Sequence, residues 1–210
     1  WKLEASPHGG CKGVHDHAEV LGAMVGINGG FFAGGCVPLD MIKNNGTLHS
    51  TNSMSGYEQP TLGWNNDQAL FFKWVAPETD WPEMSNAIGG FPGLVQDGEG
   101  LAAVYEGEQV WSTVDWENHP RTAVGFTDNN TLFMWTLDGR TDMGEGISTP
   151  GLADLLASWN INYAMGLDGG GSTTMFIENC SINGIVNFPS DNKQSDHEGV
   201  RAVSDGLYIR

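Results

Sequence analysis

Two copies of one hairpin pattern constrain the fold of this 210-residue chain more than any other sequence feature. In the first copy, an apolar pair and an Asn-Gly turn signal at 41–46 precede two apolar strands at 61–74, which an Asn-Asn-Asp turn joins. In the second copy, a similar pair and an Asp-Gly signal at 94–98 precede two such strands and an Asp-Asn-Asn turn at 122–135. Apolar strands joined by such turns are typical of β-hairpins. The repeat predicts two similarly connected hairpin units within one sheet system, and two copies are too few for a solenoid.

Composition favours a β-rich domain. Thirty glycines and eight tryptophans fit tight turns and loop-built clefts better than a helical bundle. We expect one domain over residues 1–210 of the α+β class, with a mixed, mostly antiparallel β-sheet, a few helices and a cleft at the strand ends. The segment 76–85 is expected to be a loop or lid rather than a domain linker, and the glycine-rich segment 89–93 to line the cleft.

A short helix is predicted over residues 15–24, with Ala18 and Leu21 on its apolar face. His15 and His17 lie two residues apart, and therefore on different faces of that helix. We expect both histidines to be exposed to solvent and neither to bind a metal.

A clearer helix signal begins at Thr149, the expected N-cap, and continues with Pro150 at the first helical position. The helix is expected to end near Asn160 and to support the sheet without chemistry of its own. Its apolar stripe consists of Leu152, Leu155, Leu156 and Trp159.

The net charge limits the classes of partner. Nine Lys and Arg residues against 26 Asp and Glu residues give a formal charge of −17, which argues against nucleic acid and anionic membranes as partners. No apolar run approaches the roughly 18 residues that a membrane-spanning helix needs. An anionic substrate is compatible with this charge where local arginines and backbone N–H groups hold it.

The three cysteines predict one disulfide and one free thiol. We expect Cys11 to pair with Cys36 and Cys180 to stay unpaired, and the lack of a Cys-x-x-Cys motif argues against structural zinc. Three triplets match the N-glycosylation acceptor pattern and favour a secreted or otherwise exported protein. They begin at Asn45, Asn129 and Asn179.

A strand followed by three glycines marks the candidate site. Residues 163–167 form a short, mostly apolar run that delivers an aspartate to its end. Because glycines let other groups approach the backbone closely, the carboxylate, the backbone N–H groups and the hydroxyls can recognise an anion or a sugar. The alternative is a glycine-rich turn between two strands, and this stretch alone leaves both open. It comprises Asp168, Gly169, Gly170, Gly171, Ser172 and Thr173.

A second strand end resembles the first. An apolar strand ends at Asn28, and a glycine pair that begins with Gly29 follows, so Asn28 stands where Asp168 stands in the later stretch. The Asn28 amide can bond a sugar or phosphate oxygen, or it can cap its own turn. Phe31 and Phe32 are predicted to belong to the core rather than to a sugar platform.

Two of the chain's four arginines flank one predicted hairpin. Arg121 stands just before the first strand, and Arg140 follows the second. Arginine suits bidentate binding of phosphate or carboxylate. Either arginine alone is best explained as the partner of a carboxylate, whereas both together beside a glycine-rich loop favour anion binding.

Strand-end carboxylates suit glycoside chemistry, in which one carboxylate attacks or stabilises the sugar carbon and another moves protons. Asp168 and Asp138 are the candidates. Turn and surface positions explain the weaker candidates, which are Asp40, Asp97, Asp142 and Asp191.

Over roughly residues 20–210, the chain resembles the phosphodiester glycosidase family through five motifs in a fixed order. The block at 167–175 is the most specific of them. The motifs are Asn-Gly-Gly-Phe-Phe at 28–32, Pro-Arg-Thr-Ala-Val-Gly at 120–125, Asp-Gly-Arg at 138–140, Leu-Asp-Gly-Gly-Gly-Ser-Thr-Thr-Met at 167–175 and Val-Arg-Ala-Val at 200–203.

The resemblance implies hydrolysis of a sugar-1-phosphodiester or phosphoglycan at the anomeric C–O bond, which gives free sugar and a phosphomonoester, with no cofactor or metal expected. Because phosphate leaves as a stable anion, we expect Arg121, Arg140 and the 169–172 loop to stabilise it. Asp168 or Asp138 would then act as nucleophile or water base. Family motif positions fall on Asn28, Arg121, Asp138, Arg140, Asp168, Gly170, Ser172 and Arg201.

Two other functions are compatible with these residues. A glycan- or phosphoglycan-binding module would keep the site without turnover. A metal-dependent phosphodiesterase would break the P–O bond instead, and the lack of a His-rich or clustered-Asp motif counts against it.

Overall fold

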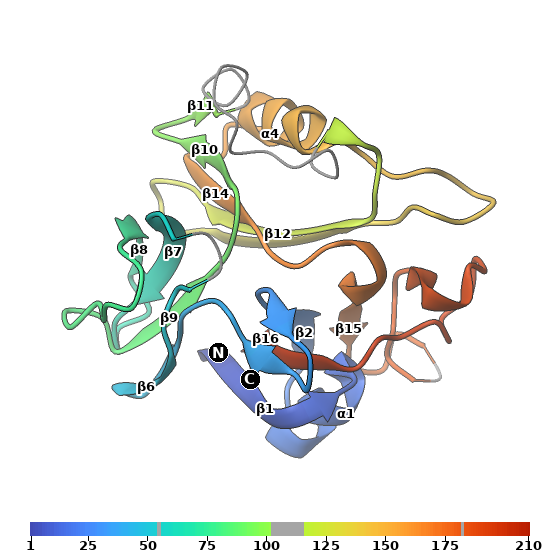
Figure 1. Ribbon diagram of the computed structural model, residues 1–210, viewed down its shortest axis with the longest axis horizontal. Coiled ribbons are helices and arrows are strands. Elements are labelled where there is room, and N and C mark those ends of the chain that lie inside the picture. The colour runs from blue at the N-terminus through green and yellow to red at the C-terminus, as the bar shows by residue number, and fades with distance from the viewer. Residues whose placement is uncertain (54–55, 102–115, 182) are drawn as a thin grey trace.

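The protein is described by a computed structural model over residues 1–53, 56–101, 116–181 and 183–210. Strands in three main sheets and two α-helices make up the described regular structure, together with two short 3₁₀ turns (Figure 1). All strand pairs in these ranges are antiparallel. The predicted α+β class is confirmed.

Two five-stranded sheets share one strand order. The first runs β6-β5-β9-β7-β8 and the second β11-β10-β14-β12-β13, so in each a later single strand inserts between two hairpins. The first contains β5 (Ile42–Asn44), β6 (Thr47–Ser50), β7 (Gln59–Trp64), β8 (Leu70–Val75) and β9 (Asn86–Gly89). The second contains β10 (Gly93–Gln96), β11 (Glu99–Gly100), β12 (Arg121–Phe126), β13 (Leu132–Leu137) and β14 (Tyr163–Gly166).

The predicted hairpins therefore exist, but not within one sheet. Strand β9 pairs with both hairpins of the first sheet, through β5 and β7. Strand β14 pairs in the same way with β10 and β12 of the second sheet. Among the described residues the two units share no ladder and pack against each other through core side chains.

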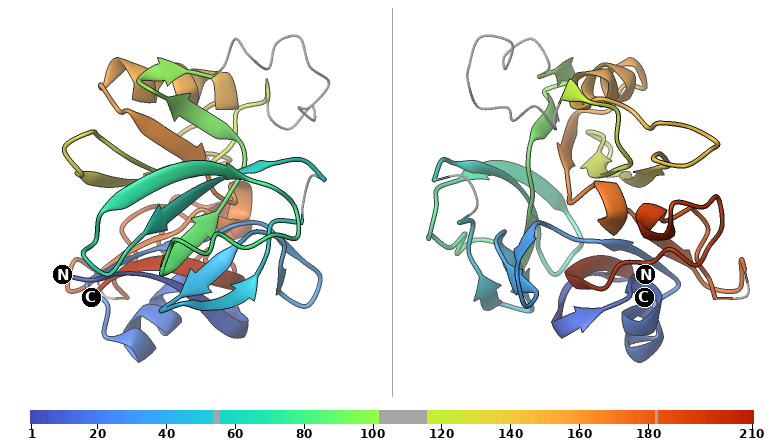
Figure 2. Two further views of the ribbon diagram at one scale, coloured as in Figure 1. Left: turned by 90° about the vertical axis from the view of Figure 1, so that its left-hand side faces the viewer. Right: turned by 45° about the vertical axis from the view of Figure 1, so that its right-hand side comes forward.

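The third sheet joins the two ends of the chain in the order β1-β16-β2-β15. Leu3 pairs with Ile209, so the termini lie side by side (Figure 2). A separate two-stranded sheet consists of β3 (Phe32–Ala33) and β4 (Val37–Pro38). The four strands of the third sheet are β1 (Leu3–Lys12), β2 (Val25–Asn28), β15 (Met175–Ile177) and β16 (Val203–Ile209).

The main core lies where the three sheets meet. Trp64 is fully buried there, and its Nε1–H donates to the Leu3 carbonyl oxygen at 3.0 Å. Leu167, the residue before Asp168, belongs to the same core and ties the candidate site to it. Members from all three sheets include Leu3, Ile27, Ile42, Leu62, Ile88, Val124, Met165 and Leu207.

Helix α1 (Val14–Leu21) is shorter than predicted, and one of its histidines is buried instead of exposed. His17 is buried, because the inward face of the helix carries Val14, His17 and Ala18. Its Nε2 lies 2.9 Å from the hydroxyl of Ser6, which provides a polar partner inside the fold. His15 is half-buried. The prediction that both are exposed was therefore wrong.

Helix α4 (Thr149–Ser158) packs on the second sheet. Its N-cap is Ser148, one residue earlier than predicted, and the Ser148 hydroxyl accepts a bond from the Gly151 N–H at 3.2 Å. The extended backbone of Ser148 allows this geometry, while Thr149 is already helical. Trp159 lies beyond the end of the helix and is 53% exposed, so it does not belong to the apolar stripe.

The segment 76–85 is a loop, as predicted, and it is pinned to the first sheet. Trp81 and Met84 are buried against Met41. The ammonium group of Lys43 pairs with the Asp80 carboxylate at 2.9 Å. None of these loop residues lines the cavity described below, so the segment does not serve as its lid in this structure.

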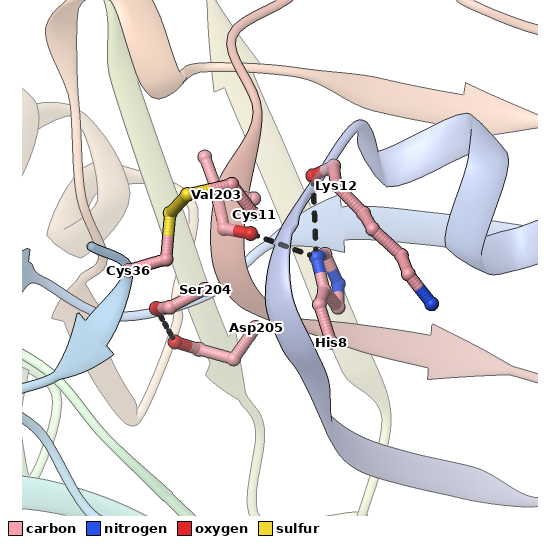
Figure 3. The surroundings of a disulfide bond; sticks show 7 residues. All are labelled: His8, Cys11, Lys12, Cys36, Val203, Ser204 and Asp205. Atoms are coloured by element: carbon pink, nitrogen blue, oxygen red, sulfur yellow. Dashed lines mark hydrogen bonds between the residues drawn. A yellow bond between two sulfur atoms is a disulfide. The ribbon is translucent and has the colours of Figure 1, made fainter.

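The predicted disulfide is confirmed. Cys11 and Cys36 are bonded and tie the end of β1 to the β3–β4 turn, next to β16 (Figure 3). Cys180 is a free, exposed thiol. No helix in the described ranges is long and apolar enough to span a membrane.

Candidate active site

A cavity of about 240 Å³ lies at the strand ends of the second sheet. It collects Asp168, Arg121, Arg140 and Arg201, which come from segments far apart in the sequence. Apolar residues line it as well. Other lining residues are Phe31, Phe91, Pro92, Leu94, His119, Thr122, Thr149, Leu152, Gly166, Leu167, Gly169, Gly170 and Gly171. The expectation that 89–93 lines the cleft is confirmed by Phe91 and Pro92.

Asp168 follows β14 and is fixed by its main chain. Its N–H donates to the Gly29 carbonyl at 3.0 Å, and its own carbonyl accepts from the Asn28 amide at 2.7 Å. Its carboxylate accepts a bond from the Ser172 hydroxyl at 2.6 Å. Burial raises the pKa of Asp168, while the Ser172 bond and the charge of Arg201 oppose that rise. Asp168 is therefore a largely buried carboxyl group and a weaker acid than an aspartate in water.

Asn28 connects the two similar strand ends. Besides the Asp168 carbonyl, its Nδ2 donates to the Gly29 carbonyl, and its Oδ1 accepts from the Thr122 hydroxyl and the Thr174 N–H. Asn28 is buried and does not line the cavity. Both strand ends are thus locked together by one amide, which positions Asp168.

The glycines allow side chains to lie against the main chain. A Cβ on Gly170, whose φ is +59°, would lie 2.7 Å from Nη1 of Arg140, and one on Gly171 would lie 2.2 Å from Nη2 of Arg201. Main-chain N–H groups in and next to the 3₁₀ turn η1 (Gly170–Ser172) are already hydrogen-bonded within the protein. Gly170, Ser172 and Thr173 donate to main-chain carbonyls, so these N–H groups are not presented to a ligand. The guanidinium groups at the cavity remain as donors suited to an anion.

Each arginine at the cavity is anchored by a neighbour. Nε of Arg121 donates to the Ile147 carbonyl at 3.0 Å, and Nε of Arg140 donates to Nδ1 of His119 at 3.1 Å. Arg201 forms a two-point ion pair with Asp191 at 2.8 and 2.6 Å. Anchoring the guanidinium groups in advance reduces the entropy that a bound anion must overcome.

Comparison with known proteins places this site in a family. A sequence profile described as phosphodiester glycosidase matches residues 21–210. The chain belongs to the phosphodiester glycosidase family. The N-acetylglucosamine-1-phosphodiester alpha-N-acetylglucosaminidases of Bos taurus and Mus musculus are 28% and 25% identical over 92% of this chain. The chain spans only 39% and 40% of the length of these two relatives.

The fold agrees with that assignment. The zebrafish N-acetylglucosamine-1-phosphodiester alpha-N-acetylglucosaminidase catalytic domain, solved in a form auto-inhibited by its pro-peptide, superposes with a TM-score of 0.78 at 24% identity. The superposition covers 99% of this chain and 72% of that chain. The resemblance read from the five motifs is therefore confirmed at the level of family and fold.

Five predicted site residues do not line the cavity of this family member, namely Asn28, Gly29, Asp138, Ser172 and Thr173. Asp138 does not line it; its Oδ1 accepts bonds from the Asn187 amide at 3.1 Å and the Phe188 N–H at 2.9 Å. Thr173 is buried beside the site, and its hydroxyl has no partner among the described residues. Asp138 is thus placed to hold the 187–188 loop.

Among the weaker carboxylates, Asp40 corrects a prediction. It is buried and accepts bonds from the Phe31 N–H at 2.5 Å and the Gln59 amide at 2.6 Å, so it has neither a turn nor a surface role. Asp97 accepts from the Tyr163 hydroxyl and Asp142 from the Ser195 hydroxyl.

Sequence reasoning missed several lining residues. His119 anchors Arg140, and its position two residues before Arg121 was the available signal. Thr149 and Leu152 bring the start of α4 to the cavity, although that helix was expected to have no role there. Phe32 packs against the core as predicted, whereas Phe31 lines the cavity.

Proposed function

We propose that this protein hydrolyses a sugar-1-phosphodiester at the anomeric C–O bond, giving free sugar and a phosphomonoester. The observation that carries the proposal is the shared cavity of Asp168 with three of the chain's four arginines. Membership of the phosphodiester glycosidase family supports the reaction class.

The proposed roles follow from charge. Arg121, Arg140 and Arg201 bind the phosphate and stabilise it as it departs. Asp168 acts on the sugar carbon, directly as nucleophile or through a water as base. Asp168 is the only carboxylate among the described lining residues, and ordinary glycosidases use two. A phosphate leaving group explains the difference, because it departs as an anion without strong help from a general acid.

The cavity favours a small substrate. Its volume of about 240 Å³ is near the lower end of ligand sites, which hold roughly 300–1,000 Å³, and suits one sugar with its phosphate. The names of the curated relatives make an N-acetylglucosamine-1-phosphodiester the first substrate to test. We also propose that the protein is exported, since a disulfide persists in oxidising compartments.

Turnover of a small panel of sugar-1-phosphodiesters in ¹⁸O-labelled water tests the proposal. We expect the label in the sugar hydroxyl and not in the phosphate, as NMR would detect. Asp168→Asn should lower kcat by at least about 100-fold, while Asp154→Asn, on the exposed face of α4, should leave it unchanged.

Three results would overturn the proposal in different ways. Label in the phosphate together with inhibition by a chelator would favour a metal-dependent phosphodiesterase. Binding of the phosphodiester without turnover, retained by Asp168→Asn, would favour a binding module. Undiminished turnover by Asp168→Asn would remove the residue assignment.

A further inference from the structure

Two buried aspartates, Asp40 and Asp205, flank the turn formed by Gly29, Gly30 and Phe31. Asp40 is 1% exposed and Asp205 is 2% exposed, and neither lines the cavity. The Phe31 N–H donates to Asp40, and the Gly30 N–H donates to Asp205 at 3.0 Å. A Cβ on Gly30 would lie 2.4 Å from Oδ2 of Asp40, and a Cβ on Gly29 only 1.7 Å from Oδ1 of Asp205. The two-glycine turn is therefore packed directly against both carboxyl groups.

This turn also holds Asp168. The Gly29 carbonyl accepts the Asp168 N–H at 3.0 Å, and the Gly29 N–H donates to the Asp205 carbonyl at 3.0 Å. A displacement of the turn by either buried carboxyl group would consequently move the main chain of Asp168.

In the part of the chain that the structure describes, only neutral groups bond these two carboxyl groups. Asp40 accepts from the Gln59 amide as well as from Phe31. Asp205 accepts from Gly30 and from the Ser204 hydroxyl, and Figure 3 shows the second of these bonds. Within the described ranges, no basic residue forms an ion pair with either. A buried carboxylate without a cationic partner is costly, which favours the protonated form.

The titratable neighbours reinforce that preference. Asp168 faces both aspartates, Asp40 faces Asp205, and Tyr208 lies near Asp205 on β16. Burial raises the pKa of Asp40 to about 6 and that of Asp205 to about 7, and the Asp168 charge adds to both rises. Arg140 and Arg201 act on Asp168 instead.

The observed contacts accommodate the protonated forms. The Ser204 hydroxyl can accept a bond from a protonated Asp205 as readily as it donates one. Gln59 has a buried Oε1 without a partner among the described residues, and rotating its amide would present this oxygen to a protonated Asp40.

We propose that Asp40 and Asp205 are positioning residues whose neutral forms hold the Gly29–Phe31 turn, and through it Asp168, in the working geometry. Ionisation of either group places a second negative charge near Asp168 in a region poor in water, and the repulsion between the carboxylates disturbs the placement of Asp168, although the Phe31 and Gly30 N–H bonds favour the charged forms. The effect on turnover rests on the proposed function, whereas the effect on stability does not.

Thermal unfolding measured against pH tests the proposal without any substrate. A carboxyl group whose pKa is higher in the folded chain contributes its full stability below its unfolded pKa of 3.8 and loses it as the pH rises through the folded value. We expect Asp205→Asn and Asp40→Asn each to gain Tm relative to wild type as the pH rises from about 4 to about 8. The control Asp154→Asn should keep a constant difference.

A constant difference for both buried variants would overturn the proposal. Failure of both variants to fold at every pH would also overturn it, because an amide should replace a neutral carboxyl group.

The pH profile of kcat tests the positioning role. We expect wild-type kcat to fall by up to about tenfold per pH unit above neutrality, with KM little changed, and Asp205→Asn to retain its kcat to higher pH. If Asp205 had a merely structural role, Asp205→Asn would lower kcat by the same factor at every pH. That result would contradict the proposal. If wild type turned over no sugar-1-phosphodiester, the proposed function would fail, and the Tm measurement would still decide this inference.

Discussion

Arg140 shows how single residues at the cavity depend on one another. Its backbone is left-handed at φ +57°, its Nε is bonded to His119, and its Nη1 reaches the place where a side chain on Gly170 would begin. A larger residue at 170 would displace the guanidinium group. In a chain of net charge −17, such anchoring concentrates positive charge where an anion would bind.

Replacing Arg140 tests this arrangement. We expect Arg140→Ala to reduce kcat/KM for a sugar-1-phosphodiester by about 10²–10³-fold, the usual cost of losing one oxyanion-stabilising donor. The control is Arg210→Ala, since Arg210 pairs with Glu4 at 3.1 Å and does not line the cavity. Steady-state kinetics on both variants suffices. Equal losses would mean that the effect is not specific to the cavity.

At the scale of elements, the two five-stranded units have the same order but different roles. The strand-end segment after β14 carries Asp168, while the equivalent segment after β9 carries Phe91 and the cis Phe91–Pro92 bond. The second unit supplies Asp168, Arg121 and Arg140 to the cavity, and the segment that follows the first unit supplies Phe91. Helix α4 lines the cavity with Thr149 and Leu152, so its stability bears on the site.

The start of α4 can be tested through its cap. Ser148→Ala removes the bond to the Gly151 N–H and should lower the free energy of unfolding by about 1 kcal/mol. Urea denaturation measures this value. Ser158→Ala is the matched control, since that exposed hydroxyl bonds a carbonyl of its own helix and should cost less. A larger loss in the control would contradict the assignment of the N-cap.

At the scale of the whole molecule, the chain closes on itself. Its first and last long strands, β1 and β16, pair in the sheet at the bottom of Figure 1, and β2 of that sheet leads into the turn that bonds Asp168. The Cys11–Cys36 disulfide ties this sheet to the β3–β4 segment, which follows the same turn. Strands from the two ends of the sequence thus support the turn that bonds the main chain of Asp168.

The contribution of the disulfide is measurable. Its cysteines are 25 residues apart, and closing a loop of that size stabilises a fold by about 3 kcal/mol in the chain-entropy account. We expect the Cys11→Ser/Cys36→Ser variant to lose about 2–4 kcal/mol of unfolding free energy in denaturant titrations. Cys180→Ser should lose almost none, because that thiol is exposed and unpaired. Equal stability of all three proteins would contradict this role.

Features set by neighbours in the sequence were predicted well. Turn residues specified both hairpins, the glycine-rich blocks specified the family, and the cysteine count specified one disulfide, for which the expected Cys11–Cys36 pairing is confirmed. The N-cap shifted by one residue because Ser148 and Thr149 are equally suited to capping, and only backbone geometry distinguishes them. Phe31 was misplaced because an aromatic ring after a strand suits either a core or a cavity wall.

The sequence by itself determined the strand and turn chemistry, the family and the set of polar residues available to a site, because these depend on residues close together along the chain. Only the tertiary structure decided which of those polar residues share a buried volume. It buried Asp40, Asp205 and His17, and it placed Asp138 outside the cavity that holds Asp168. The physical reason is that burial and the distances between charges arise from packing among distant segments, and these set the protonation state of each carboxyl group.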